Sequence, residues 1–145
     1  MIEYRPAVAL DLLHLEVQAS QSRELEYVRQ TPGMADEIVE RSLCLSGHVG
    51  GFPVAVAGFV PSGAVSHRAW AFFAPEAGPY MLGIVRKARA MMSSLRSRRI
   101  DMTVNEGFIE GERFARLLGM ERETSTALKY HGVLGEHQHI YGKVR

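Results

Sequence analysis

Three histidines near the C-terminus have a spacing that metal sites use. His137 and His139 are two residues apart, so both side chains would point to the same face of a strand, and His131 lies nearby in the sequence. Pairs of this kind can bind zinc or nickel. Because no cysteine or cluster of acidic residues adjoins them, we interpret these histidines as a polar edge and expect no metal site.

Two other groups of residues have types suited to chemistry. His67 could act as a general base, but Arg68 and Trp70 share the opposite face of the same alternating segment, which favours a structural role in a sheet. Basic residues from Arg86 to Arg99 could contact nucleic acid. They surround an apolar helical stripe without interleaved aromatic side chains, which is typical of a solvated helix face, so we expect no nucleic-acid partner.

The composition is that of an ordinary globular protein. The chain has 145 residues, of which 46% are hydrophobic and 23% charged, and this length predicts a single domain over residues 1–145. The net charge of +1 provides no general attraction for polyanions. The lone Cys44 cannot form an internal disulfide, and the longest apolar run, Phe52–Val60, is too short to cross a bilayer. We therefore expect a cytoplasmic protein with no membrane partner.

Hydrophobic periodicity predicts the elements that position these residues. Ile2–Arg5 alternates as a strand does, and Asp11 is placed to cap a first helix, whose pattern continues to Val28. A second helix carries Ile38 and Leu43. A three-stranded antiparallel meander follows, with strands over Leu43–Val49, Pro53–Val60 and Ala64–Phe73.

The second half of the chain alternates between helices and strands. Helices are expected over Gly78–Arg98 and Phe108–Leu118, and strands over Ile100–Val104, Glu121–His131 and Gln138–Val144. Gly119 lies where a left-handed C-cap belongs. The order is strand, two helices, three strands, helix, strand, helix and two strands. It predicts an α/β protein with a mixed sheet and helices on both faces.

This order of elements resembles the GNAT acyltransferase superfamily, and two segments are similar to it in detail. Phe72-Phe73-Ala74-Pro75-Glu76 looks like the fourth strand of a GNAT running into its Pro-Glu corner. The stretch from Phe114 to Leu118-Gly119-Met120 looks like the aromatic-rich helix that ends in Leu-Gly-Phe. The resemblance covers nearly the whole chain and implies a GNAT-like fold.

The resemblance also implies where acetyl-CoA would bind if the chain is active. Backbone groups around Phe73 and Ala74 would pair with the pantetheine amides, and the turn holding Glu76, Gly78 and Gly83 would carry the pyrophosphate. The candidates for proton transfer are then Glu106, Tyr80 and His67. In this alternative the chain is an acetyl-CoA-dependent N-acetyltransferase with an amine substrate.

Three positions depart from the family pattern. The glycine-rich pattern of the pyrophosphate turn falls on Gly78, Met81 and Gly83, of which only the last matches. Pro79 lies in the same turn and has no amide hydrogen to offer a phosphate. The tyrosine acid of the family falls on Ala115, which has no proton to donate, and the asparagine that opens that helix falls on Phe108.

A narrower resemblance concerns Leu43–Val60 with its Gly51-Phe52-Pro53 corner, the aromatic strand through Trp70, and Arg113-Phe114. These stretches are similar to small GNAT-like proteins of short-tailed coliphages, which are assigned to particle assembly. We therefore expect a phage-encoded, catalytically degenerate protein without a cofactor, which acts in virion assembly through contacts with other phage proteins. Its expected location is the bacterial host cytoplasm or the virion, and the sequence carries no signal for an oligomeric state.

Overall fold

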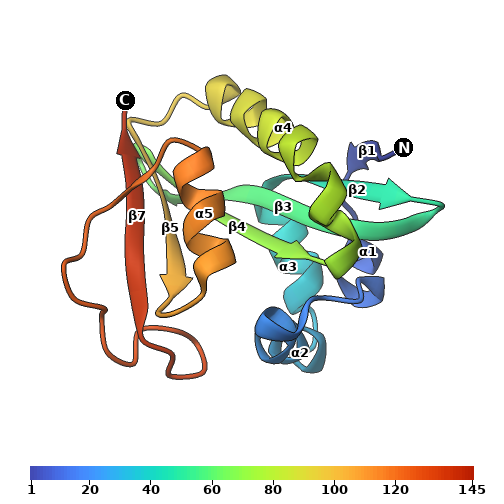
Figure 1. Cartoon of the computed structure of the whole chain (residues 1–145), viewed down its shortest axis with the longest axis horizontal. Coiled ribbons are helices and arrows are strands. Elements are labelled where there is room, and N and C mark those ends of the chain that lie inside the picture. The colour runs from blue at the N-terminus through green and yellow to red at the C-terminus, as the bar shows by residue number, and fades with distance from the viewer.

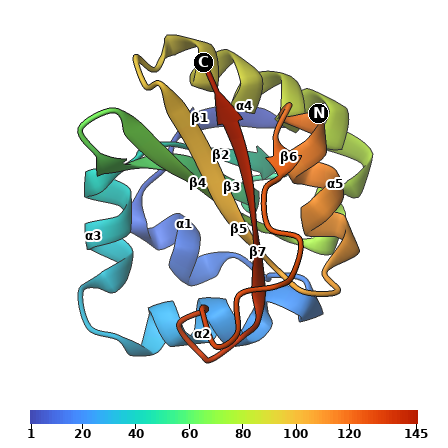
Figure 2. The same cartoon turned by 90° about the vertical axis from the view of Figure 1, so that its left-hand side faces the viewer.

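A seven-stranded sheet separates two layers of helices in the computed structural model, which describes residues 1–145 (Figures 1 and 2). The strand order is β1-β2-β3-β4-β5-β7-β6. Neighbours are antiparallel except β4 and β5, which are parallel. Helices α1, α2 and α3 lie on one face, and α4 and α5 on the other (Figure 2). The predicted mixed α/β class with helices on both faces is confirmed.

The bounds of the elements are as follows. The strands are β1 (Glu3–Pro6), β2 (Leu43–Val49), β3 (Phe52–Gly63), β4 (Ser66–Phe73), β5 (Arg99–Asn105), β6 (Glu121–Arg122) and β7 (Gln138–Val144). The α-helices are α1 (Ala9–His14), α2 (Ser22–Gln30), α3 (Met34–Arg41), α4 (Met81–Ser94) and α5 (Ile109–Leu117). Two short 3₁₀ helices, η1 (Ala19–Gln21) and η2 (Pro75–Tyr80), precede α2 and α4.

The N-terminal region forms three α-helices where the sequence pattern predicts two. Asp11 is the third residue of α1, not its N-cap, and its carboxylate accepts the Val8 N–H at 2.9 Å from inside the first turn. The Arg29 guanidinium of α2 donates to the carbonyls of Leu12 and Leu15, which the end of α1 leaves without helical partners. A break separates α1 from α2, and η1 lies in that break.

Two predicted elements of the second half have different bounds. Pro79 removes an amide near the start of the expected helix, so a 3₁₀ segment precedes α4, which ends at Ser94. The strand predicted over Glu121–His131 is wrong beyond Arg122. There the Thr124 hydroxyl, in place of a backbone carbonyl, accepts the Ile140 N–H at 3.2 Å, and Tyr130 takes a positive φ of 54°.

The other predicted elements are confirmed, except that the helix predicted to carry Leu43 ends at Arg41, and Leu43 begins β2. The meander of β2, β3 and β4 has the expected antiparallel pairing, with Gly50 and Gly51 at positive φ in its first turn. Gly119 closes α5 in the left-handed conformation with φ 88°. Side chains from both helix layers pack on the sheet in one cluster of 27 buried hydrophobic residues. No helix is long and apolar enough to span a bilayer.

Candidate functional site

β4 and β5 are paired over only three residue pairs. Ser66, His67 and Arg68 face Arg99, Ile100 and Asp101, and beyond them the two strands separate. The rest of β4, Ala69–Phe73, is paired with β3 on one edge and has no strand on the other. A gap therefore opens in the sheet at the carboxyl ends of two parallel strands, where α/β folds commonly bind ligands.

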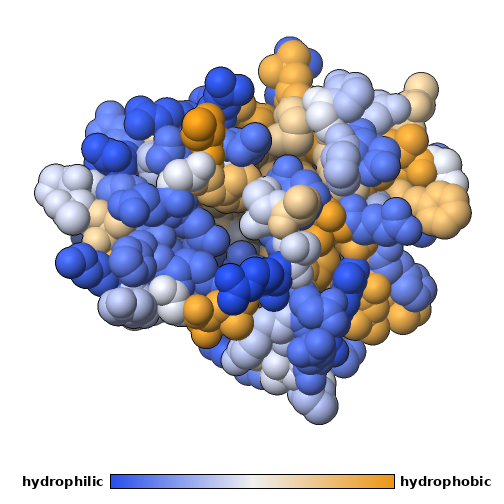
Figure 3. All heavy atoms as spheres, turned by 60° about the horizontal axis from the view of Figure 1, so that its bottom comes forward, coloured by the Kyte–Doolittle hydropathy of each residue, from blue (hydrophilic) through white to orange (hydrophobic).

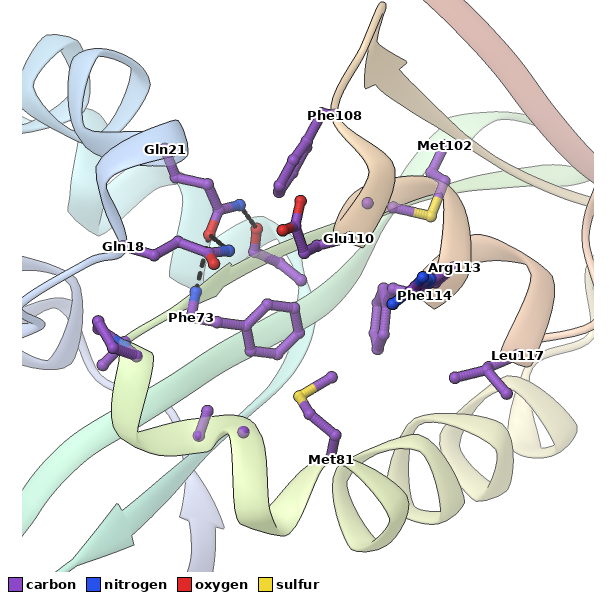
Figure 4. A pocket seen from close by; sticks show the side chains of 16 residues that line it. Gln18, Gln21, Phe73, Met81, Met102, Phe108, Glu110, Arg113, Phe114 and Leu117 are labelled. Atoms are coloured by element: carbon purple, nitrogen blue, oxygen red, sulfur yellow. Dashed lines mark hydrogen bonds between the residues drawn. The ribbon is translucent and has the colours of Figure 1, made fainter.

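An apolar cavity of about 360 Å³ fills this gap on the α4 and α5 side. Its walls come from the end of β4, the start of α4, β5 and α5 (Figure 4). Phe73 and Phe114 meet edge to face in it, with ring centroids 5.1 Å apart. Glu110 and Arg113 of α5 are the charged residues of its lining. The cavity, which we call the donor cavity, suits a narrow and largely apolar ligand.

The edge of β4 that lies beside the donor cavity has no neighbouring strand, but it is hydrogen bonded to a side chain and the backbone of the η1 region. The Gln21 Nε2 donates to the Ala71 carbonyl at 2.8 Å, and the Gln21 Oε1 accepts the Phe73 N–H at 2.9 Å (Figure 4). The Gln18 N–H donates to the Phe73 carbonyl at 2.8 Å. Gln21 is buried, so water competes little for these hydrogen bonds. No motif or periodic pattern in the sequence marks this glutamine.

The turn between β4 and α4 offers few amides to an anion. Pro75 and Pro79 have none, and the N–H groups of Ala77 and Met81 already donate to the carbonyls of Ala74 and Gly78. A Cβ added to Gly78 would meet no atom within 4 Å, so the space above the turn is open. Gly83 instead packs against β1, where its Cβ would lie 3.2 Å from the Tyr4 hydroxyl.

A second cavity, of about 440 Å³, lies on the α2 and α3 side of the sheet. Tyr27, Trp70 and Phe72 are among its lining residues. Two smaller cavities adjoin it, and Glu24 of α2 lines all three. We call this group of cavities the acceptor cavities. On the underside of the molecule, where α2 lies in Figure 1, the surface is hollowed near its centre, with apolar side chains among polar ones at the rim (Figure 3).

Glu24 is a titratable group of the acceptor cavities whose carboxyl is perturbed by its surroundings. Burial raises the pKa of the Glu24 carboxyl, and the negative charge of Glu136 raises it further. A carboxylate with a raised pKa accepts protons well near neutral pH. The polar spacing of α2 contained no signal for this role, because Glu136 approaches from the far end of the chain.

The donor and acceptor cavities adjoin through the gap between β4 and β5. Gln21, Ala71 and Met102 line both the donor cavity and one of the smaller acceptor cavities. Glu24 lines that same smaller cavity. The gap thus brings together groups from η1, α2, β4 and β5 that are far apart in the sequence.

Some of the residues that the sequence predicts for acetyl-CoA binding line the donor cavity, and others do not. Phe73, Ala74 and Gly78 line the donor cavity. Glu76 is exposed on η2, and Gly83 faces Tyr4. Ala115 is fully buried, and its carbonyl accepts the Met120 N–H.

None of the three candidates for proton transfer lines the donor cavity or an acceptor cavity. Glu106 is exposed in the turn after β5, and Tyr80 packs against the core at the end of η2. His67 lies at the paired end of β4, and its Nδ1 shares a hydrogen bond with the Ser97 hydroxyl. Any acid or base at the gap must therefore come from other residues.

The C-terminal histidines lie in separate hydrogen bonds. His139 Nδ1 shares one with the Thr124 hydroxyl at 2.8 Å, and His131 Nδ1 shares one with Gln138 Oε1 at 2.9 Å. His137 precedes β7, so it does not share a strand face with His139 as the spacing predicts. No three metal-ligating side chains converge anywhere in the chain. Cys44 is partly buried, and burial raises the pKa of its thiol.

The fold matches solved acetyltransferases over nearly its whole length. A GNAT-family acetyltransferase from Bacillus anthracis has 15% identity and a TM-score of 0.66, with 99% of this chain and 94% of that chain covered. The chain has the GNAT fold. A candidate phosphinothricin N-acetyltransferase superimposes with a TM-score of 0.73 at 12% identity, covering 99% and 98% of the two chains.

A third GNAT-fold relative was solved with its ligands. The microcin C7 self-immunity acetyltransferase MccE, in complex with acetyl-CoA and AMP, has 15% identity and a TM-score of 0.65, with 99% of this chain and 92% of that chain covered. No family model and no curated protein matches the sequence. At these identities the likeness establishes the GNAT fold and leaves the activity to the residues of the site.

The residues of the gap fit coenzyme A in part. The donor cavity has the size and apolar lining for the pantetheine arm of coenzyme A. The free edge of β4, however, has its groups at Ala71 and Phe73 engaged by Gln21 and Gln18, and the turn after it has two prolines. The edge can therefore accept pantetheine amides only after Gln21 leaves it.

Proposed function

We propose that the chain is an N-acetyltransferase that uses acetyl-CoA as the donor and an amine as the acceptor. The observation that supports this most is the gap between β4 and β5, with the donor cavity on one side and the acceptor cavities on the other. A transfer reaction requires two substrates to meet at one point, and this gap lets them approach from opposite faces of the sheet. The likeness of the fold to acetyltransferases agrees with the proposal.

On the donor side, the end of β4 would position the thioester. Once Gln21 has left the edge, the backbone of Ala71 and Phe73 would align the pantetheine arm, while Phe73, Met81 and Phe114 exclude water from the acyl group. When bound, acetyl-CoA supplies an acyl group activated as a thioester. The turn after β4 would contribute little to pyrophosphate binding, so we expect weak affinity for the nucleotide part.

On the acceptor side, Glu24 would accept the proton that the substrate ammonium must lose before its nitrogen can act as a nucleophile. Its raised pKa suits this task, and the acceptor cavities bring solvent-accessible space to its carboxylate. Tyr27, Trp70 and Phe72 would hold the apolar part of the amine. This assignment replaces His67, which lies at the other end of β4.

Thermal unfolding with and without acetyl-CoA tests the proposal. A ligand that binds only the native state at a hundredfold excess over Kd adds about 2.7 kcal/mol of stability. For a domain of this size, that should raise the midpoint by about 5 °C. Adenosine 3′,5′-bisphosphate, which lacks the pantetheine arm, is the matched control and should raise it less. No shift at millimolar acetyl-CoA contradicts the proposal.

A second candidate is the catalytically degenerate virion-assembly protein that the sequence resemblance suggests. Three observations bear on its catalytic degeneracy, though not on a role in the virion: Ala115 in place of an acid, the prolines of η2, and the engagement of the β4 edge by Gln21. It predicts association with other phage proteins through the surface of the domain. Particles assembled without this chain should then lack components or infectivity, and particles of unchanged composition and infectivity would exclude the role.

A further inference from the structure

The carboxamide of Gln21 imitates the N–H and C=O groups of one residue of a missing neighbouring strand. It donates to the Ala71 carbonyl and accepts from the Phe73 N–H, which is how an adjacent strand or an extended ligand pairs with a strand edge. The backbone N–H of Gln18 completes the pattern at the Phe73 carbonyl. All three β4 groups lie in the part of the strand that has no partner in β5.

The Gln21 side chain is held in this position by more than its two bonds to β4. The Gln18 Nε2 donates to the Gln21 Oε1 at 3.1 Å, and the residue is 7% exposed. Gln21 is the last residue of η1, which lies between α1 and α2. Since Gln21 lines both the donor cavity and the acceptor cavity beside it, it stands between the two sides of the gap.

We infer that Gln21 is an internal latch that competes with the amide groups of the pantetheine arm for the Ala71 and Phe73 positions of β4. This inference rests on the proposed function, because it takes coenzyme A as the ligand. In the latched state the edge is closed to an amide-bearing ligand. Binding requires the Gln21 carboxamide to leave, so the apparent affinity equals the affinity of the open state multiplied by the fraction of molecules that are open.

The direct test is the affinity for coenzyme A, measured by titration calorimetry on the full chain. The variant Gln21→Ala frees the Ala71 carbonyl and the Phe73 N–H, and we expect its Kd to fall by about tenfold or more relative to the unaltered chain. Gln30→Ala is the matched control, because Gln30 is an exposed glutamine of the same region whose side chain bonds only to Glu26. Its Kd should be unchanged.

A second variant keeps the test valid if Gln21→Ala folds poorly. Gln21→Glu has the same shape and can still accept the Phe73 N–H, but it offers no donor to the Ala71 carbonyl, which its carboxylate oxygen repels. Its Kd for coenzyme A should also fall, and hydrogen exchange at the Phe73 amide should remain slower than in Gln21→Ala.

The outcomes separate the latch from the proposed function. Tighter binding by the Gln21 variants and not by Gln30→Ala supports the latch. Equal Kd values for the unaltered chain and the Gln21 variants overturn the latch and leave the proposed function standing. Failure of every variant to bind coenzyme A at millimolar concentration overturns both, and Gln21 is then a permanent structural replacement for a cofactor.

Discussion

At the residue scale, Glu24 should make the stability of the protein depend on pH. Its carboxyl pKa is raised by burial and by Glu136, so the native state binds this proton more tightly than the unfolded chain does. The contribution of Glu24 to the free energy of unfolding is fully present below the ordinary carboxyl pKa and is lost as pH rises through the raised pKa of the native state. Glu24→Gln should therefore unfold at a higher temperature than the unaltered chain near about pH 7 and at the same temperature near about pH 3.

Thermal unfolding across this pH range is the measurement, with Glu26→Gln as the control because Glu26 is exposed on the same helix. The control should show no such crossover. A Glu24→Gln variant that is less stable than the unaltered chain at neutral pH would show that the carboxylate has a cationic partner in solution. If Glu24 is the base, the same substitution should abolish the increase in acetyl transfer that accompanies ionisation of this carboxyl as pH rises.

At the element scale, η2 and β3 contain glycines that should respond in opposite ways to alanine. In η2, a Cβ on Gly78 meets no atom within 4 Å, and its φ is not positive. Gly78→Ala should therefore stabilise the fold by about 0.4–1 kcal/mol through the unfolded chain. Denaturant unfolding measures this, and the control Gly33→Ala, at φ 78°, should destabilise. A destabilised Gly78→Ala would show that the turn needs a glycine for its own fold.

The glycine of β3 has a different role, which is close packing between strands. A Cβ on Gly58 would lie 2.6 Å from the Cys44 Cβ and 2.9 Å from the Leu43 carbonyl oxygen, on the neighbouring β2. Gly58→Ala should cost about 1–3 kcal/mol in denaturant unfolding, because two strands of the meander must shift. A loss of stability below about 0.5 kcal/mol would mean that β2 and β3 can move apart at Gly58 with little loss of packing.

Local sequence patterns predict a helix or strand correctly wherever residues close together in the sequence determine it. The meander follows from strand alternation and paired glycines, and the end of α5 from Gly119. The Asp11 carboxylate accepts a backbone N–H at the start of α1, as its residue type indicates, but the carbonyls at the end of α1 are satisfied by Arg29, a residue of the next helix. The candidate site depends on interactions between residues still further apart in the sequence. Gln21 is hydrogen bonded to Phe73, 52 positions away, and the charge of Glu136, near the other end of the chain, acts on Glu24.

At the scale of the whole molecule, the sheet consists of two halves joined at a narrow point. β1 to β4 form one half and β5 to β7 the other, with only three backbone pairs between them. The last pair, Arg68 and Asp101, is also an ion pair, with the Arg68 Nε 2.9 Å from the Asp101 Oδ1. The other Asp101 oxygen accepts from the Arg99 Nε at 3.2 Å, and Arg99 in turn binds Glu123 next to β6.

This network should set how firmly the two halves hold together. Asp101 is buried while Arg68 and Arg99 are about a third exposed, so the loss on breaking the pairs is smaller than for a fully buried pair. Asp101→Asn should therefore cost about 1–3 kcal/mol in urea unfolding. The matched control is Glu37→Gln, which breaks an exposed pair with Arg41 and should change stability by less than about 0.5 kcal/mol.

The same variant tests whether the junction also supports the gap beyond it. If Arg68 and Asp101 fix the angle at which β4 and β5 diverge, Asp101→Asn should speed hydrogen exchange in β5 and weaken coenzyme A binding together. Stability lost with unchanged affinity would mean that the walls of the donor cavity are held by packing of Phe73 against Phe114 instead. The wide end of the gap would then keep its shape independently of its narrow end, and binding would depend on the donor cavity and Gln21 without a contribution from the Arg68–Asp101 pair.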